Sequence, residues 1–210
     1  MPAFSPPLVP PAPRPLLLAA GDLPSLVVLA LRHRDRKPMP RLLFVHDGRD
    51  ASAARLRRLR EQMDRYGLGT LEELHAVHLR AERGPGGEAA HPPLADAQLL
   101  LAACQAAGRR GSTPVIWATA RGDAAGDATA AVPARLAAHE TCLLVRRLQE
   151  AAGVEPVPVE TPLVELHLEQ VMALGRRASV DPGLAWACAF RGPAPCGSCD
   201  GCRRLRAAVG

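Results

Sequence analysis

The sequence predicts an α/β fold with a parallel sheet and a cysteine-rich segment at its C-terminal end. Short apolar runs alternate with helical stretches along most of the chain, and this pattern is typical of parallel strands joined by helices. Four of the six cysteines lie between Cys188 and Cys202. A chain of 210 residues can bury one good core. We therefore expect a flexible leader over residues 1–15, one α/β domain over 16–180 and a metal-binding segment over 181–210.

The leader is rich in proline, which neither extends a helix nor donates a full set of strand hydrogen bonds. It lacks the basic and apolar regions of a signal peptide, and no apolar run reaches the ~20 residues that a membrane span needs. We therefore predict a cytoplasmic protein without a membrane partner. The net charge of +5 is modest and comes almost wholly from arginine. Aromatic residues make up only 3% of the chain, which argues against a surface that stacks nucleic-acid bases.

The elements follow from the spacing of the apolar residues. We expect strands at Leu16–Ala20, Arg41–His46, Leu74–Leu79, Pro114–Thr119 and Val154–Val159. Pro156 and Pro158 restrict the last of these to a sheet edge. We expect helices at Leu26–Leu31, Ala51–Tyr66, Ala95–Gly108, Leu136–Ala152 and Leu166–Arg176, and a Gly/Pro-rich loop at Gly84–Pro93. Cys104 lies in the third helix and is expected to be an inert core thiol. His75 and His78 would point to opposite faces of their strand, so they are poor ligands for one metal.

The cysteine spacing is that of a metal site. Cys196, Cys199 and Cys202 are each separated by two residues, so one tight loop can direct three thiolates at one point, and Cys188 can fold back as the fourth ligand. Four thiolates suit Zn²⁺ and leave no open coordination position, which predicts a structural role. The alternative is two disulfides, which a chain without a secretory signal does not favour.

Three motifs carry a resemblance to a known family. They are Thr161-Pro162-Leu163, Trp186-Ala187-Cys188 and Cys196-Gly197-Ser198-Cys199-Asp200-Gly201-Cys202. From Val159 to Leu205, their order and spacing resemble the 7-cyano-7-deazaguanine synthase family of queuosine biosynthesis. The resemblance implies an ATP-pyrophosphatase fold of the PP-loop type (adenine nucleotide alpha hydrolase-like) with a structural zinc. It also implies that a family member uses ATP to convert 7-carboxy-7-deazaguanine and ammonia to the nitrile.

The phosphate-binding loop of that family departs from its usual sequence here. The family has Ser-Gly-Gly-x-Asp-Ser, and of the aligned residues Ala20 to Ser25 only Gly21 and Ser25 match. Asp22 places a carboxylate where a phosphate should lie, and it can cap the following helix instead. Pro24 removes an N–H donor. We therefore expect Gly21, Asp22 and Ser25 to form a degenerate nucleotide-binding loop with weak ATP binding. In the alternative, Mg²⁺ held by Asp22 bridges to ATP.

Further polar residues follow strands whose carboxyl ends should border a ligand pocket. The resemblance implies pocket roles for His46, Asp47 and Arg49, and the next such loop supplies Arg121, Asp123 and Asp127. The alternative for this second group is a solvated loop. Asp96 stands where the family carries an Arg-Asn pair. The arginines between Arg55 and Arg60 spread around their helix, as on a solvated face.

Three hypotheses of function remain. The first is a divergent 7-cyano-7-deazaguanine synthase-like enzyme. The second is an inactive, zinc-stabilised relative that serves as a binding or scaffold subunit. The third, a zinc-dependent nucleic-acid binder, rests only on charge. The expected partners are a deazapurine or nucleotide-like small molecule and a second copy or another subunit.

Overall fold

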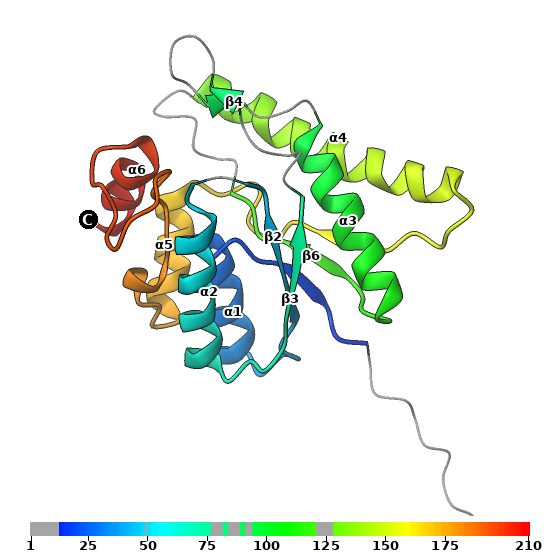
Figure 1. The fold of residues 1–210 in the computed structure, drawn as a ribbon, viewed down its shortest axis with the longest axis horizontal. Helices are drawn as coiled ribbons and strands as arrows, with labels where there is room; N and C mark the ends of the chain where they lie inside the picture. Colours follow the sequence, from blue (N-terminus) through cyan, green and yellow to red (C-terminus); the bar gives the residue numbers. More distant parts are fainter. Residues whose placement is uncertain (1–12, 49, 77–81, 84–88, 91–93, 121–127) are drawn as a thin grey trace, which may run out of the picture.

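A five-stranded parallel sheet forms the centre of the molecule in the computed structural model (Figure 1), which describes residues 13–48, 50–76, 82–83, 89–90, 94–120 and 128–210. The strands are β1 (Leu16–Leu18), β2 (Arg41–His46), β3 (Leu71–His75), β6 (Val115–Trp117) and β7 (Val159–Glu160). Their order is β3-β2-β1-β6-β7, and every pair is parallel. The strands around Leu18, Leu43 and Ile116 are adjacent in this order, and the predicted parallel sheet is confirmed.

Helices cover both faces of the sheet (Figure 1). One face carries α1 (Leu23–Arg34), α2 (Ser52–Tyr66) and α5 (Leu168–Arg177), and the other carries α3 (Ala95–Arg109) and α4 (Ala128–Ala151). A 3-10 helix (Pro182–Leu184) and α6 (Asp200–Val209) complete the C-terminal segment. The prediction of a parallel α/β domain with a C-terminal four-cysteine loop is therefore confirmed.

Successive side chains along a strand point to opposite faces of the sheet and so contribute to the hydrophobic cores on both faces. In β1, Leu17 contributes to the core under α1 and α2, whereas Leu16 contributes to the core under α3. Both side chains are fully buried. Helix α1 has almost no polar face, and Leu26 and Leu29 are fully buried because the helix packs between the sheet and its neighbours. Burying each such leucine contributes about 1.5–3 kcal/mol to folding.

Several predicted boundaries were wrong. The third strand lies at Leu71–His75 and not at Leu74–Leu79, and residues 77–81, which include His78, lie outside the described residues. Residues Ala89–Ala90 (β5), inside the stretch predicted as a loop, pair with Glu82–Arg83 (β4) just before that stretch. The last strand is only two residues long, although it does lie at the sheet edge. Helix α4 begins at Ala128 because its helical pattern extends well before Leu136.

Both ends of the described chain are attached to the α/β core. The carbonyl of Pro15 accepts from the Arg41 N–H at 2.9 Å, which joins the described end of the predicted leader to the sheet, while residues 1–12 lie outside the described residues. At the other end, Arg176 donates to the carbonyls of Ala208 and Val209 at 3.1 and 2.7 Å. The division into domains at residue 180 stays a prediction. Among the described residues, no helix is long and apolar enough to cross a membrane.

Candidate functional site

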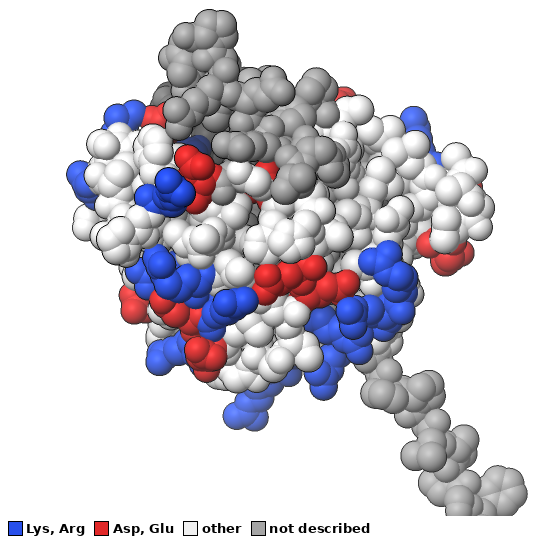
Figure 2. Space-filling view, viewed as in Figure 1, with Lys and Arg blue, Asp and Glu red and all other residues white. Residues whose placement is uncertain are grey.

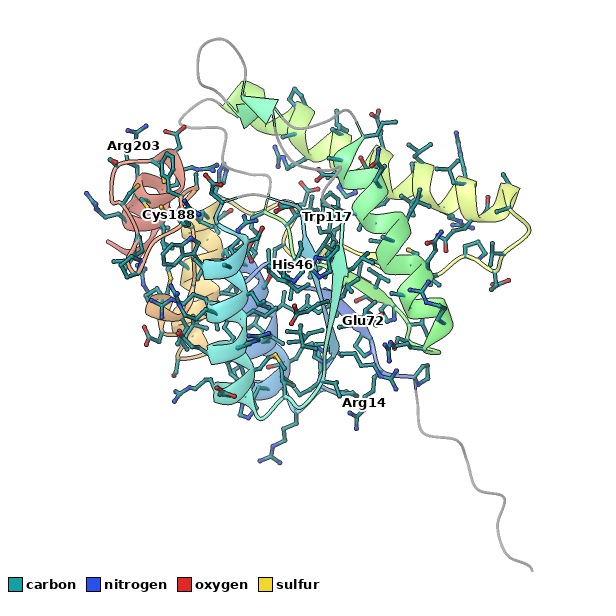
Figure 3. All side chains as sticks on the ribbon, in the orientation of Figure 1. Arg14, His46, Glu72, Trp117, Cys188 and Arg203 are labelled. Carbon is teal, nitrogen blue, oxygen red and sulfur yellow. The ribbon has the colours of Figure 1, made fainter. Side chains whose placement is uncertain are left out.

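Four cysteine sulfur atoms converge beside α6. Cys188 precedes the loop, Cys196 lies within it, and Cys199 and Cys202 flank the first turn of α6. All four sulfurs lie within 4.8 Å of one another, with Cys188 to Cys199 at 3.9 Å and Cys196 to Cys202 at 4.0 Å. Figure 3 labels Cys188 in this segment. All six cysteines of the chain are described and are free thiols, so the structure does not contain the alternative pair of disulfides.

Backbone N–H groups point at two of these sulfurs, those of Cys188 and Cys196, whereas burial raises the pKa of the Cys202 thiol. The N–H groups of Phe190 and Cys196 each lie 3.4 Å from the Cys188 sulfur. Hydrogen bonds from the backbone of Cys199 and then of Ser198 lower the pKa of the exposed Cys196 thiol to about 6. Metals bind the thiolate, so donors arranged in this way prepare the site for a cation.

The size of the cluster fits a single ion. With metal–sulfur bonds of about 2.3 Å, the sulfurs of a tetrahedral Zn²⁺ site lie about 3.8 Å apart, close to the separations of 3.9 and 4.0 Å found here. In a four-iron cluster, each thiolate binds a different iron, so the sulfurs lie farther apart. The four cysteines can therefore hold a metal, and their spacing is compatible with a single ion.

In the predicted phosphate loop, backbone N–H groups donate hydrogen bonds to side chains of the same loop. Asp22 is the N-cap of α1, and its Oδ1 accepts from the Ser25 N–H at 3.1 Å. The Ser25 hydroxyl oxygen accepts from the Ala20 N–H at 3.1 Å, and Pro24 carries no N–H. An anion site at a helix N-terminus depends on free donors in this first turn. Here Asp22 occupies one of them, the Ser25 N–H, and the Ser25 hydroxyl occupies the Ala20 N–H just before the helix.

The same loop is tied to the cysteine segment. Gly21 has a φ of +67°, and a Cβ atom at this position would lie 2.1 Å from the Arg55 carbonyl oxygen. Its own carbonyl accepts from the Trp186 N–H at 2.9 Å, two residues before Cys188. Gly201 is equally constrained, since a Cβ there would lie 1.9 Å from the Ala187 carbonyl oxygen. Only glycine allows these close approaches.

A pocket of about 330 Å³ opens at the carboxyl ends of the central strands. Its walls come from the ends of β1, β2 and β6, from the loop before α1, and from the cysteine segment. Five charged residues line it: Asp22, Asp47, Asp96, Arg55 and Arg204. Three acids against two bases give this described lining a formal charge of −1. Trp117, labelled at the end of β6 in Figure 3, and Trp186 add aromatic surface.

The predicted pocket residues have different positions. Asp47 lines the pocket, where it accepts from the Ser52 hydroxyl at 2.8 Å and faces Arg55 at 3.8 Å. His46 is not among the lining residues. Its Nε2 atom lies 2.8 Å from a carboxylate oxygen of Glu73, and its ring stacks on His75 with ring centroids 4.3 Å apart. The hydrogen bond with His46 is the main cause that lowers the pKa of Glu73. Arg49, Arg121, Asp123 and Asp127 lie outside the described residues.

Sequence reasoning missed Arg55, Arg204 and the two tryptophans as pocket residues. The arginines of α2 were interpreted as one solvated face, but they have specific contacts. Arg57 lies over the Trp186 ring at 5.8 Å, and Arg60 pairs with Glu73 at 2.9 Å. On the face shown in Figure 2, basic and acidic side chains are interspersed. One feature of the sequence could have identified Arg204 as a pocket residue. It lies two residues after Cys202, which is a predicted metal ligand.

The C-terminal third of the chain is similar in sequence to known proteins. Residues 137–209 match the family described as queuosine biosynthesis protein QueC. Two 7-cyano-7-deazaguanine synthases, from Thermosynechococcus vestitus (strain NIES-2133 / IAM M-273 / BP-1) and Koribacter versatilis (strain Ellin345), are each 39% identical over 66 and 69 residues. The C-terminal third of the chain is thus similar to QueC proteins. The aligned stretches cover 30% and 32% of this chain but only 28% of each relative.

A solved structure shares the fold of the whole domain. The U34-tRNA thiolase NcsA from Methanococcus maripaludis, solved with its [4Fe-4S] cluster, superimposes with a TM-score of 0.52 over 94% of this chain and 64% of its own. Its sequence identity is 11%, so the likeness concerns the fold alone.

Proposed function

We propose that this QueC-like chain is a metal-stabilised binding protein for a deazapurine-like heterocycle and that it has lost the ATP-dependent step of its relatives. The observation that carries the proposal is the capping of α1 by Asp22. Its carboxylate takes the Ser25 N–H, while the pocket beside it stays open. The site thus has room for a small molecule but has lost donors for phosphate.

The charge of the pocket supports the same conclusion. A triphosphate would meet the carboxylates of Asp22, Asp47 and Asp96, and Asp47 already faces Arg55. At ~4 Å and an effective dielectric of ~20, a pair of like charges costs roughly 4 kcal/mol before screening by salt. A neutral ring avoids this cost, and its N–H groups can donate to a carboxylate.

The pocket walls suit a planar ring in size and in polarity. A volume of about 330 Å³ is at the small end of ligand pockets. Trp186 lines the pocket, and its buried indole N–H has no hydrogen-bond partner among the described residues. Buried donors are nearly always paired, so this N–H favours a ligand that brings an acceptor. A deazaguanine offers both donors and acceptors on its edges.

We further propose that Zn²⁺ occupies the four-cysteine site and has a structural role. Four thiolates at these separations match its tetrahedral preference and leave no position for a substrate. Because Ala187, Gly201 and Arg204 belong to this segment and line the pocket, the metal would also hold one pocket wall in place.

Calorimetry on the full, metal-loaded chain tests the function. We expect the neutral 7-cyano-7-deazaguanine to bind more tightly than the anionic 7-carboxy-7-deazaguanine, and ATP with Mg²⁺ to give no measurable heat and no pyrophosphate. Asp96→Asn should weaken the heterocycle about tenfold, because a charged acceptor in the lining is lost. The same change at the exposed Asp64 of α2 is the matched control. A folded, metal-loaded protein that binds neither heterocycle would contradict the proposal.

A second candidate is the synthase activity itself. It is favoured by one observation, namely that the Asp22 carboxylate lines the pocket, where it could hold Mg²⁺ against the phosphates. In that case, ATP binding would be tight, would depend on magnesium and would be lost in Asp22→Ala. Pyrophosphate release by the unaltered chain would decide for this candidate.

A further inference from the structure

Basic side chains gather at the edge of the sheet where strands β3, β2, β1 and β6 begin, which is the edge opposite the pocket. Helices α1, α2 and α3 end at this same edge, beside the first residues of the strands. Basic side chains predominate along the lower margin of Figure 2, and Figure 3 labels Arg14 at that margin. We define the basic edge as nine residues: Arg14, Arg32, Arg34, Arg36, Lys37, Arg41, Arg65, Arg109 and Arg110.

The basic edge carries more positive charge than the chain as a whole. Its acidic neighbours are Asp35, Asp64 and Glu72, so nine basic and three acidic residues give this region a formal charge of +6. The whole chain carries +5, so all its other residues together sum to −1. The described pocket lining at the opposite edge is also negative. The charge of the molecule is therefore separated across the sheet.

Most of these cations have no carboxylate partner within the part of the chain that the structure describes. Arg34 and Lys37 share Asp35 at 2.7 and 3.9 Å, and Arg110 pairs with Glu72 at 2.5 Å. The remaining six form no ion pair there: Arg14, Arg32, Arg36, Arg41, Arg65 and Arg109. Their charge is therefore available to a partner.

Helix ends explain only part of this charge. Arg32, Arg65 and Arg109 lie in the last turns of their helices, where a cation is favoured by the negative end of the helix dipole. That effect is lost beyond the last turn. Arg41 begins β2, and Lys37 lies two residues beyond the C-cap of α1. These residues add positive charge that no helix end requires.

The cations form a band and not a site for one small anion. Helices α1 and α3 lie on opposite faces of the sheet, so the basic edge extends across all three layers of the molecule (Figure 1). A nucleic-acid duplex presents a phosphate about every 3.4 Å along each strand, which is a repeating target for such a band. Eight of the nine cations are arginine, whose planar guanidinium matches phosphate oxygens in pairs.

The uncharged residues of this surface distinguish between polyanions. The large exposed apolar side chains of the described chain lie elsewhere, on α4, before α3 and β7, and in the cysteine segment. The basic edge thus lacks the anchors that protein interfaces and lipid surfaces use. Its aromatic rings, those of His33 and Tyr66, pack against each other with centroids 5.5 Å apart. They offer little surface to stack an unpaired base, whereas a duplex has its bases already stacked and its phosphates outward.

We propose that the basic edge binds the phosphate backbone of a double-stranded nucleic acid without reading its bases. Binding of this kind is driven by the release of counterions from the phosphates, so it is independent of sequence and sensitive to salt. It requires neither the metal nor a stacking surface. It also does not depend on the proposed function, because the pocket lies at the other edge of the sheet. RNA and DNA duplexes share the phosphate chemistry, and the experiment separates them.

Fluorescence anisotropy of the full, metal-loaded chain with labelled RNA and DNA duplexes of about 20 base pairs tests the proposal. We expect micromolar binding to one or both duplexes at about 50 mM salt, and a logarithm of the binding constant that falls linearly with the logarithm of the salt concentration. The single strand, poly-glutamate and vesicles that contain phosphatidylserine should each bind at least threefold more weakly. The absence of duplex binding, or binding of any of these three as tight as the duplex, would overturn the proposal.

A double variant locates the binding surface. Arg14→Ala with Arg109→Ala removes two exposed cations of the basic edge that form no ion pair. It should weaken duplex binding at least tenfold at about 50 mM salt and reduce the steepness of the salt dependence by about two, because each phosphate contact contributes about 0.9. The control is Arg177→Ala with Arg191→Ala, which removes the same charge from exposed positions on α5 and the cysteine segment. Equal losses in the two variants, with both folded by circular dichroism, would show that net charge alone attracts the duplex and would refute the basic edge as its site.

Discussion

The backbone N–H of Trp186 donates a 2.9 Å hydrogen bond to the carbonyl of Gly21. This contact joins the residue two positions before Cys188 to the loop that begins α1. The cysteine segment and the loop before α1 are therefore joined, and both line the pocket through Asp22, Trp186 and Arg204. A substitution in one of these two segments should therefore affect the structure of the other.

Gly21→Ala should destabilise the fold strongly. The added Cβ would lie 2.1 Å from the Arg55 carbonyl oxygen, and the residue has a φ of +67°. The left-handed conformation costs an alanine about 1–2 kcal/mol, and the collision with a backbone atom adds to this cost. Urea unfolding measures the loss. Gly153→Ala is the control, because it has a φ of +70° and no atom within 4 Å, so it should show the conformational cost alone. Equal losses in the two variants would refute the close approach.

The sequence was sufficient for the features that depend on local pattern. Runs such as Leu42-Leu43-Phe44-Val45 predict buried strands because they suit a sheet covered on both faces. The cysteine spacing predicts the convergence of the sulfurs because three of the four lie in one short loop. The capping of α1 follows from a residue type that prefers this position.

Features that depend on long-range register were not predictable from the sequence. His46 is the last residue of β2 and was expected in the pocket, but β2 pairs with β3 so that His46 lies opposite His75 and beside Glu73. That pairing draws its ring away from the pocket. Arg55 looked like any other arginine of its helix, and only the approach of Asp47 from the neighbouring loop distinguishes it.

Cys199→Ser should remove the metal and loosen the C-terminal segment. Binding free energy at a four-thiolate site is also folding free energy, so a chelator should have the same effect on the unaltered chain. Metal analysis and tryptophan fluorescence, which reports on the buried Trp186, measure the two losses. Cys104→Ser is the control. Cys104 lies in the core under α3, so this variant should still bind the metal. A metal-free chain with unchanged fluorescence would contradict the structural role.

Thiol alkylation of the metal-free chain should depend on pH in a site-specific way. The pKa of Cys196 is lowered to about 6, below the ordinary value of 9.0, so its thiolate forms as pH rises through about 6. Burial raises the pKa of Cys104 to about 11, so this thiol should stay unreactive at neutral pH. Mass spectrometry after brief treatment with iodoacetamide between pH 5 and pH 8 separates the two sites. Metal loading should protect Cys196, and equal rates at both cysteines would show that the N–H groups do not stabilise its thiolate.

The double variant Asp22→Gly, Pro24→Asp rebuilds part of the family loop and should bind ATP better than the unaltered chain. Removing the Asp22 carboxylate frees the Ser25 N–H and removes a negative charge worth roughly 4 kcal/mol at ~4 Å and an effective dielectric of ~20. Replacing Pro24 restores one backbone N–H to the first turn of α1. Replacing the Asp22 N-cap by Gly should lower the free energy of unfolding by only a few tenths of a kcal/mol, and binding should be measured where the variant is fully folded. Calorimetry with ATP, with and without Mg²⁺, compares the double variant with Asp22→Gly alone. Because Pro24 sits at the second helical position, the single variant still lacks the N–H of this residue, so the double variant should bind ATP more tightly. If the unaltered chain already binds magnesium ATP tightly and both variants lose that binding, Asp22 is a metal ligand and the loop is a divergent active site.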